Sequence, residues 1–501
     1  MQLLHDLAIG FGVAATPFNL MFAFFGAMIG TLIGVLPGIG PIATIAMLLP
    51  LTFKLEPTSG LIMLAGIFYG AQYGGSTTAI LVNMPGETSS VVTCLDGHQM
   101  ARQGRAGSAL AIAALGSFFA GTVATFVIAL FAPPLAAIGQ SFGAPEYFSL
   151  LLLGLIAAVV LAHGSVIKAV AMIILGLLLG LVGTDGNTGG QRFTLGITEL
   201  SDGIDFAVLA IGVFGVGEII TNLAQPAETR SLVMQKVTRL WPTAEDFRQA
   251  WPAVLRGTAL GSILGVLPGG GAALSSFAAY VFEKKVAKDP SRFGRGAVEG
   301  VAGPESANNA GAQTSFIPML TLGIPGNAVM ALMIGAMTIH GIQPGPQVMA
   351  ERPETFWGMV ASMWIGNLML VVINLPLIGI WVQLLKVPYR FLYLSVLLFC
   401  AIGVYTISNS PFAVLLAAFF GVLGFIFTKL ECEPAPMLLG FVLGPLMEEN
   451  LRRAMRISSG DPMIFVTRPI SLVLLIAAAV LLVMVALPAI RSKREEAFQE
   501  G

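Results

Sequence analysis

The feature that most limits the fold of this chain is the recurrence of long apolar segments. Each covers about 20 residues, enough to cross a hydrocarbon core of about 30 Å as a helix. Charged residues make up only 11% of the 501 residues, whereas a soluble domain carries roughly 25%. The sequence therefore predicts an all-α polytopic membrane protein. The segments are Ala109–Phe131, Tyr147–Ala162, Val166–Val182, Phe206–Ile220, Phe356–Val382, Phe391–Ile407, Phe412–Phe427 and Ile470–Leu487.

Several other classes of protein are disfavoured by composition and motifs. The three cysteines lie far apart, without the spacing of a zinc site or a disulfide framework. A net charge of −1 gives no electrostatic basis for binding nucleic acid. The chain contains no P-loop, HExxH or GxSxG motif. We therefore expect neither an enzyme nor a bound cofactor.

Two motifs occur twice in the same order. The octapeptide GVLPGIGP at Gly34–Pro41 returns as GVLPGGGA at Gly265–Ala272. A second segment, from Gly70-Ala71-Gln72 to Pro85-Gly86, resembles the segment from Gly311-Ala312-Gln313 to Pro325-Gly326. The agreement in order and spacing predicts two related halves. We expect a first repeat at 1–225 with a hairpin near 20–53 and a broken helix at 60–99, a cytoplasmic linker at 226–256, and a second repeat at 257–501 with a hairpin near 257–283, a broken helix at 305–340 and C-terminal helices.

Basic residues in short loops indicate the orientation of the halves, since such loops favour the cytoplasm. The linker and the loop after the second GVLPG are both basic, so the intervening stretch should enter the membrane and return as a re-entrant hairpin. In the first half the basic loop, with Arg102 and Arg105, follows Pro85-Gly86 instead, which places the first hairpin outside. The sequence thus predicts inverted repeats and about 11–12 membrane segments, with the topology of the last three segments left open.

Glycine and proline predict where helices break inside the membrane, because they cost about 1 and 3 kcal/mol in a helix interior. The expected hairpin tips are Pro37–Gly40 and Pro268–Gly271, and the expected broken helices are Ser76–Ser90 and Thr314–Asn327. Unpaired backbone survives at membrane depth only in protein or beside a wet cavity. A helix N-terminus there suits a carboxylate, and unwound carbonyls suit a sodium ion. The breaks therefore predict a transport site.

The candidate site combines these breaks with the small polar residues beside them, whose hydroxyls and amides can bind an anion or a cation. The alternative is that these residues cap helices and allow close packing. Glu87 and Glu305 are candidates for ion coupling rather than direct ligands, because a carboxylate repels an anion. Asp96, Lys168 and Glu218 lie near expected helix ends, where snorkelling explains them. The candidate binding residues are Gly38, Gly40, Ser76, Thr77, Thr78, Asn83, Gly86, Thr88, Ser89, Gly269, Gly270, Asn308, Asn309, Gln313, Thr314, Ser315, Gly326 and Asn327.

The ordered motifs resemble one known family. GVLPGIGP, YGAQYGGSTTAILVNMPGETSS with DGHQMARQGRAG, GVLPGGGAALSSF and GPESANNAGAQTSFIPMLTLGIPGNAVMALM are similar to the large membrane subunit of the tripartite tricarboxylate transporters. The resemblance is close from about Gly34 to Pro346 and rests on hydrophobicity beyond that.

The resemblance implies a bacterial secondary carrier in the inner membrane. An extracytoplasmic solute-binding protein would deliver citrate, another tricarboxylate or a related organic acid. A small membrane subunit would assist, and a gradient of sodium or protons would drive symport. The alternatives are a passive channel or an exporter for organic anions, or a structural membrane scaffold; dependence of uptake on an ion gradient and on the binding protein would separate these from a carrier.

Overall fold

The computed structural model describes residues 2–36, 40–161, 165–224, 237, 240–267, 271–384 and 389–486. The first half is almost entirely helical, with one short antiparallel β-hairpin that pairs Gly183 with Arg192. Its elements are α1 Gln2–Ala14, α2 Pro17–Val35, α3 Pro41–Thr52, α4 Pro57–Val82, η1 Thr88–Ser90, α5 Val91–Met100, η2 Ala101–Arg105, α6 Ala106–Gln140, α7 Ala144–Leu161, α8 Val166–Gly180, β1 Gly183–Thr184, β2 Gln191–Arg192, η3 Thr198–Leu200, α9 Phe206–Ala210, η4 Ile211–Val216 and α10 Gly217–Leu223.

The second half is helical throughout its described part. Its first helix begins inside the range expected for the linker, because Thr243 caps it and accepts a hydrogen bond from the Asp246 N–H. Its elements are α11 Ala244–Gly265, α12 Gly271–Val286, η6 Pro290–Arg292, α13 Glu299–Thr314, α14 Phe316–Leu322, α15 Ala328–Ile339, α16 Gln347–Glu351, α17 Pro353–Asn374, α18 Ile378–Leu384, α19 Tyr389–Ser408, α20 Pro411–Lys429, α21 Ala435–Ile457, α22 Ile464–Thr467 and α23 Pro469–Ala486.

The expected all-α, multi-pass class is confirmed. Within the described residues, five helical stretches are long and apolar enough to cross a membrane, and six shorter apolar helices accompany them. Large apolar side chains are exposed on the outer helices, for example Leu394 at 72% and Leu415 at 70%. Exposed apolar surface on this scale fits contact with lipid. The exact number of crossings and the inverted relation of the halves stay predictions.

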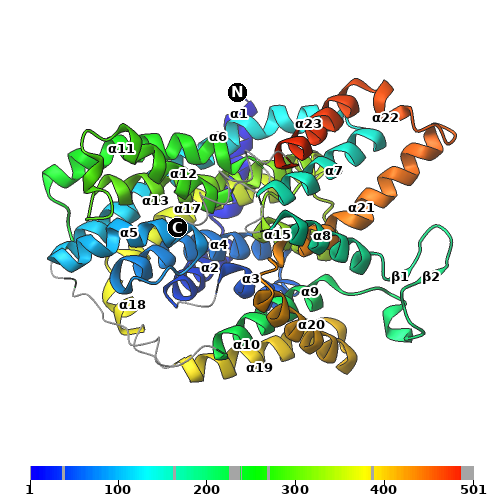
Figure 1. Ribbon diagram of the computed structural model, residues 1–501, viewed down its shortest axis with the longest axis horizontal. Coiled ribbons are helices and arrows are strands. Elements are labelled where there is room, and N and C mark those ends of the chain that lie inside the picture. Colours follow the sequence, from blue (N-terminus) through cyan, green and yellow to red (C-terminus); the bar gives the residue numbers. More distant parts are fainter. Residues whose placement is uncertain are drawn as a thin grey trace.

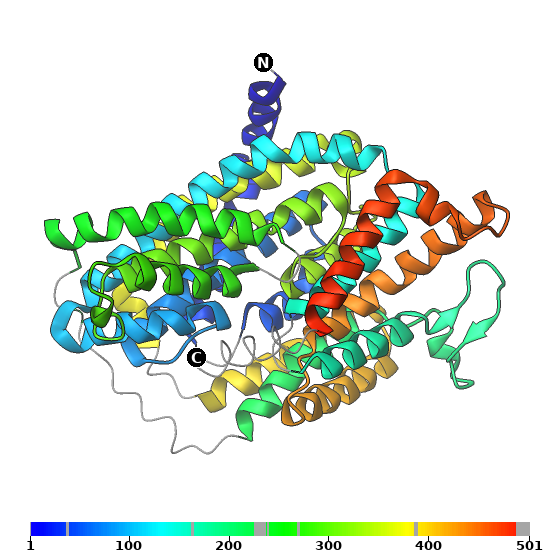
Figure 2. The same ribbon diagram turned by 45° about the horizontal axis from the view of Figure 1, so that its top comes forward.

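Two helix pairs make the most extensive helix–helix contacts of the molecule. Helix α2 packs on α4, and α11 packs on α13 (Figures 1 and 2). Gly26, Gly30 and Gly34 of α2 face the α4 backbone so closely that a Cβ on any of them would lie 2.3–2.4 Å from a carbonyl oxygen. Such spacing of small residues lets two backbones approach within a membrane.

Helix α11 repeats this arrangement. A Cβ on Gly257 or Gly261 would lie 2.2 or 2.3 Å from a backbone oxygen of α13, and one on Gly265 would lie 2.2 Å from the Thr314 hydroxyl. These glycines follow those of α2 at an offset of 231 residues, the same offset as between the two GVLPG motifs. The duplicated sequence therefore encodes two similar helix contacts.

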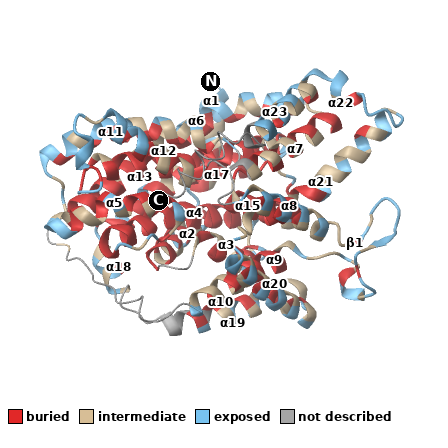
Figure 3. Ribbon diagram, in the orientation of Figure 1, coloured by how far each residue is buried: buried red, intermediate tan, exposed pale blue. Residues whose placement is uncertain are grey.

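The two halves are interleaved rather than side by side. Helix α13 contacts α4, α5 and α6 of the first half, and α17 packs on α1, α2, α4 and α6. Figure 3 shows these inner helices as the most buried part of the molecule. Every residue of α13 after Glu299 is buried, although the helix is rich in polar residues. Its polar side chains therefore face protein rather than lipid, and the amide groups of Asn308 and Gln313 have no hydrogen-bond partner among the described residues.

The segments that the distribution of basic residues assigns to the cytoplasm lie close together. Arg105 forms an ion pair with Asp246 at 2.5 Å. The Gln103 amide donates to the Arg295 carbonyl at 2.8 Å. These contacts bring the turn before α6, the start of α11 and the loop before α13 to one side of the molecule. These three segments therefore lie on the same side, as their common assignment to the cytoplasm requires. Which side is cytoplasmic stays a prediction.

Candidate functional site

Both broken helices end in the same way. Helix α4 stops at Asn83 (φ 57°), and α14 stops at Gly323 (φ 72°), each in the left-handed conformation that terminates helices. Pro85 and Pro325 follow two residues later and prevent the helix from resuming at once. The breaks thus lie at 83–87, in the middle of the first expected segment, and at 323–327, at the end of the second.

The next helices also begin alike. Glu87 and Asn327 have nearly the same extended backbone, with φ of −155° and −158°. Glu87 makes a capping box with Ser90 at the start of η1, which runs directly into α5. The Asn327 side chain accepts a hydrogen bond from the Met330 N–H at 2.9 Å and caps α15. In both, a side-chain oxygen accepts from a backbone N–H at the helix start: the Ser90 hydroxyl from the Glu87 N–H at 3.4 Å, and Asn327 from the Met330 N–H.

The starts of five helical segments meet at one cavity of about 360 Å³. Its wall includes Gly40 before α3, Thr88 in η1, Gly271 at the start of α12, Asn327 before α15 and Ala435 at the start of α21. Each helix start carries free N–H groups and the positive end of a helix dipole. The cavity lies in the size range of small-molecule sites, roughly 300–1,000 Å³. Its backbone is therefore suited to an anion.

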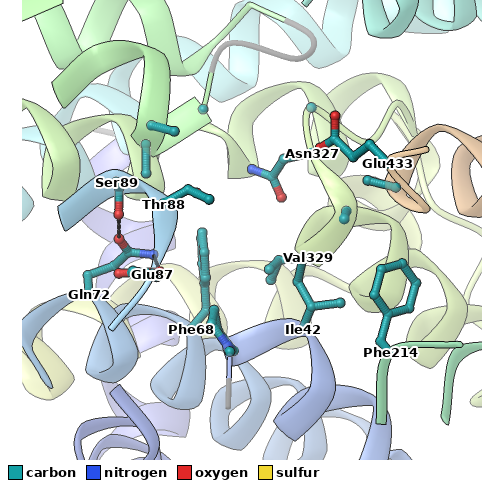
Figure 4. A pocket seen from close by; sticks show the side chains of 18 of the residues that line it. Ile42, Phe68, Gln72, Glu87, Thr88, Ser89, Phe214, Asn327, Val329 and Glu433 are labelled. Carbon is teal, nitrogen blue, oxygen red and sulfur yellow. Dashed lines mark hydrogen bonds between the residues drawn. The ribbon is translucent and has the colours of Figure 1, made fainter. Parts of the chain in front are cut away.

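Side chains give the cavity a polar side and an apolar side. Figure 4 shows Gln72, Thr88, Ser89 and Asn327 around part of the wall. The apolar residues that line it are Ile42, Phe68, Phe214, Val329 and Leu439.

Gln72 holds the polar side together. Its Nε2 donates to Glu87 Oε2 at 3.0 Å, and its Oε1 accepts from the Ser89 hydroxyl at 2.9 Å. The amide therefore fixes the orientation of two pocket side chains from the neighbouring helix α4. The sequence marks Gln72 only as part of a repeated motif, and its partner is visible only in the fold.

Three carboxylates also line the cavity, namely Glu87, Glu218 and Glu433, whereas none of the described lining residues is Lys, Arg or His. Glu218 accepts a hydrogen bond from the Gly40 N–H at 3.0 Å. The interpretation of Glu218 as a snorkelling residue is therefore wrong, because its carboxylate turns inward to a helix start. No motif near Glu218 or Glu433 indicates this placement, which depends on how α10 and α21 pack.

Asp96 likewise does not snorkel. Its side chain is fully buried, and it accepts hydrogen bonds from the N–H groups of Gly296 and Ala297, both at 2.8 Å, and from the Tyr280 hydroxyl at 3.0 Å. Three donors satisfy the carboxylate inside the protein. Asp96 therefore fastens the loop before α13 to α5.

The candidate residues from the sequence divide into three groups. Gly40, Gly86, Glu87, Thr88, Ser89, Gly326 and Asn327 line the cavity. Gly38, Gly269 and Gly270 lie outside the described residues. The candidates outside the described lining of the cavity are Ser76, Thr77, Thr78, Asn83, Asn308, Asn309, Gln313, Thr314, Ser315 and Glu305.

Several candidates of the third group bond to nearby backbone. Thr78 donates to the Val35 carbonyl at 2.8 Å, Thr314 to the Ala310 carbonyl at 3.0 Å, and Ser315 to the Ala312 carbonyl at 2.7 Å. This is the arrangement that the helix-packing alternative describes.

Comparison with known proteins agrees with the arrangement of the motifs. Residues 20–439 match the Tripartite tricarboxylate transporter TctA family. The chain is 60% identical over 500 residues to an "Uncharacterized 52.8 kDa protein in TAR-I ttuC' 3'region" of Agrobacterium vitis, covering all of this chain and 99% of that protein. A second protein of that organism, in the "TAR-II ttuC' 3'region", is 59% identical over 240 residues, which are 48% of this chain and 99% of its own length.

No solved structure matches the chain. The family match covers both halves and the breaks that line the cavity. The family is one of transporters and not of enzymes. Its members work with a small membrane subunit and a solute-binding protein. The chain therefore belongs to the tripartite tricarboxylate transporter TctA family and is the membrane component of a transport system.

Proposed function

We propose that this chain is the carrier subunit of a secondary-active uptake system in a bacterial inner membrane. A solute-binding protein would hand over a tricarboxylate or related organic acid, with citrate as the first candidate. A sodium or proton gradient would drive the transport. The observation that carries the proposal is the convergence of five helix starts on one cavity.

The helix starts account for binding of a carboxylate. Free N–H groups at helix N-termini hold anions without any basic side chain. The amide and hydroxyl groups of Gln72, Thr88, Ser89 and Asn327 add donors to the same wall. In carriers built from repeated, broken helices, such half-helix starts face the carboxylate of the substrate.

The carboxylates of the cavity support ion coupling. Glu87, Glu218 and Glu433 line the same space that an anionic substrate would enter. Like charges close together in one cavity repel, unless protons or cations compensate them. Binding of the substrate and binding of a cation or proton are therefore linked in this cavity.

The test is uptake of labelled citrate by proteoliposomes that contain the full chain, with the small membrane subunit and the solute-binding protein encoded beside it. The decisive variant is Gly326→Trp, because a Cβ at Gly326 has no atom closer than 3.9 Å and the indole would enter the cavity. We expect uptake to fall at least tenfold while the protein remains folded and inserted.

The control is Gly12→Trp in α1, where a Cβ also meets nothing within 4 Å and which does not line the cavity. It should transport like the original chain. Full uptake by Gly326→Trp would contradict the cavity as the transport site. Uptake without any ion gradient or binding protein would favour a passive channel.

A further inference from the structure

A second acidic site lies in the interior, away from the described lining of the cavity. Glu305 is 1% exposed and lies on α13. Its two carboxyl oxygens contact hydroxyl groups of the first half. Ser76 Oγ on α4 lies 2.5 Å from Oε2, and Thr93 Oγ1 on α5 contacts Oε1. Glu305 thus connects the two halves at a point that is closed to solvent.

The hydrogens available at Ser76 constrain the state of Glu305. The Ser76 oxygen also lies 2.9 Å from the carbonyl oxygen of Gln72. A hydroxyl has a single hydrogen to donate, and a carbonyl can only accept. If Ser76 donates to Gln72, its bond to Glu305 requires a hydrogen from the carboxyl group. Thr93 can then donate to the other carboxyl oxygen. A neutral, protonated Glu305 satisfies all three contacts at once.

The charges around Glu305 agree with this count. In the part of the chain that the structure describes, no Lys, Arg or His forms an ion pair with Glu305. An ionised carboxylate buried without a cation costs several kcal/mol. Each carboxyl oxygen of Glu305 instead has a hydroxyl group in direct contact with it.

The titratable groups on the neighbouring helices do not supply a positive charge either. Tyr73 on α4, Cys94 on α5 and Glu87 at the first break are within electrostatic reach of Glu305. Arg256 of α11 and Glu283 of α12 pair with each other at 2.5 Å.

The other ionisable groups on these helices bond to residues other than Glu305 or lie at the outer ends of the helices. Asp96 of α5 is held by the loop before α13, Tyr280 of α12 donates to it, and His98 of α5 bonds the Ile80 carbonyl. Asp246 of α11 pairs with Arg105. The charged side chains at the outer ends of α11, α12 and α13 are Glu245, Arg248, Lys284, Lys285 and Glu299, and α6 carries no charged residue.

From these contacts we infer that Glu305 is a proton-binding site of the carrier, held in its protonated form in this conformation. This inference rests on the proposed function where it concerns transport. Gln72 links the two acidic sites, since its carbonyl bonds Ser76 and its side chain bonds Glu87 in the cavity. A movement of one half against the other would separate Ser76 and Thr93 from Glu305. The carboxyl group would then lose the contacts that favour its proton.

A cavity of about 10 Å³ lies beside Ser76 and is lined also by Tyr73, Thr77, Ser117 and Asn374. This volume is about that of a single water. The Tyr73 hydroxyl has no hydrogen-bond partner within the described residues. A water at this point would be a hydrogen-bonding partner for a proton that leaves Glu305.

Infrared difference spectroscopy on the full chain in lipid tests the site without any substrate. A protonated carboxyl group has its own carbonyl-stretching band, which shifts in D₂O. At pH 7 a solvent-exposed Glu is ionised, since its pKa is about 4.3. We expect the original protein to show such a band at pH 7, and Glu305→Gln to lose one component of it. Gln can keep both hydroxyl contacts, so the variant should fold.

The matched control is Glu283→Gln, which removes a buried carboxylate that has a cationic partner and should leave the band unchanged. If Glu305→Gln does not fold, Ser76→Ala serves instead and should shift the band, because the acid loses its acceptor. An unchanged band in Glu305→Gln, or in Ser76→Ala, overturns the proton site.

Citrate uptake as a function of pH then separates the two proposals. Glu305→Gln should lose the response of uptake to a proton gradient. A band that depends on Glu305 in a protein that moves no carboxylate would leave the proton site standing and contradict the proposed function. Citrate uptake by the original chain without such a band would leave the proposed function standing and contradict the proton site.

Discussion

The two helix breaks share one backbone design and differ in charge. Each has a left-handed helix end, a proline, a glycine and an extended capping residue, at an offset of 240 residues. The cap is a carboxylate, Glu87, in the first break and a neutral amide, Asn327, in the second. The duplicated frame therefore supplies two helix starts to one cavity, while only the first cap adds a titratable group there.

The largest effect should come from the glycines before the caps. A Cβ at Gly86 would lie 2.2 Å from the Gly34 carbonyl oxygen and 2.5 Å from the Gly75 Cα, both rigid backbone atoms, whereas one at Gly326 meets nothing within 3.9 Å. We expect Gly86→Ala to destabilise the protein by about 3 kcal/mol or more, and Gly326→Ala by less than about 0.5 kcal/mol. Thermal unfolding in detergent measures both. Equal stability of the two variants would show that the breaks are packed alike.

The next effect concerns charge in the cavity. Asn327→Asp is isosteric and keeps the cap, but it places a fourth carboxylate beside the anion. A repulsion of about 1.4 kcal/mol, moderate for charges near a protein surface, is a tenfold loss of affinity. We expect the citrate concentration for half-maximal uptake to rise about tenfold.

Glu87→Gln is the reciprocal change, since it keeps an oxygen for Gln72 and removes the charge. The variant should not raise the citrate concentration for half-maximal uptake. It should weaken the dependence of uptake on the ion gradient. If Asn327→Asp transports citrate as the original chain does, the anion does not bind near this cap.

A smaller effect should follow from loss of the second cap. Asn327→Ala removes the oxygen that accepts from the Met330 N–H and should cost about 1 kcal/mol of stability. Thr243→Ala, which removes the corresponding oxygen at the start of α11, is the control with a similar cost. Only Asn327→Ala should also reduce uptake, and a parallel loss in both variants would attribute the effect to stability alone.

The smallest effect is expected at the β-hairpin outside the helical segments. The N–H of Asn187, with Thr188, Arg192 and Arg452, holds the pKa of Asp185 well below its usual range. A carboxyl whose pKa is lowered by folding stabilises the fold above its unfolded pKa of about 3.9 and loses this contribution as the pH falls through the folded value.

The hairpin should therefore resist proteolysis equally between pH 5 and 8, and Asp185→Asn should make it more sensitive. Any change of uptake between pH 5 and 8 is then caused by acidic groups other than Asp185. Cleavage of the original hairpin that increases between pH 8 and pH 5 would contradict this assignment.

Local chemistry made the breaks predictable from the sequence. Proline and glycine at 85–86 and 325–326 exclude a continuous helix whatever surrounds them, and the repeated motifs indicated that the two breaks correspond. The first helix of the second half begins about a dozen residues before the expected start of the second hairpin, since Thr243 caps α11 before the sequence becomes strongly apolar, while the bounds of the hairpin stay a prediction.

Tertiary packing decided the rest of the site. Glu218 and Glu433 reach the cavity from α10 and from the loop before α21, and neither carries a motif that links it to the breaks. Conversely, the polar residues of α13 looked like ligands by composition, but packing between α4, α5, α6, α11 and α12 puts them in the interior. Sequence patterns specify which helices break, and only the packed fold specifies which side chains share a space.

The central claim is that helix starts from both halves hold a carboxylate in one cavity. The most direct measurement is an experimental density map of the full chain in a lipid environment with saturating citrate, compared with a map without it. The account predicts added density within hydrogen-bonding distance of the backbone N–H groups of Ile42, Thr88 and Ala328, in the first turns of the helical segments after Gly40, Gly86 and Gly326. Citrate density at another place, with this cavity unchanged, would contradict it.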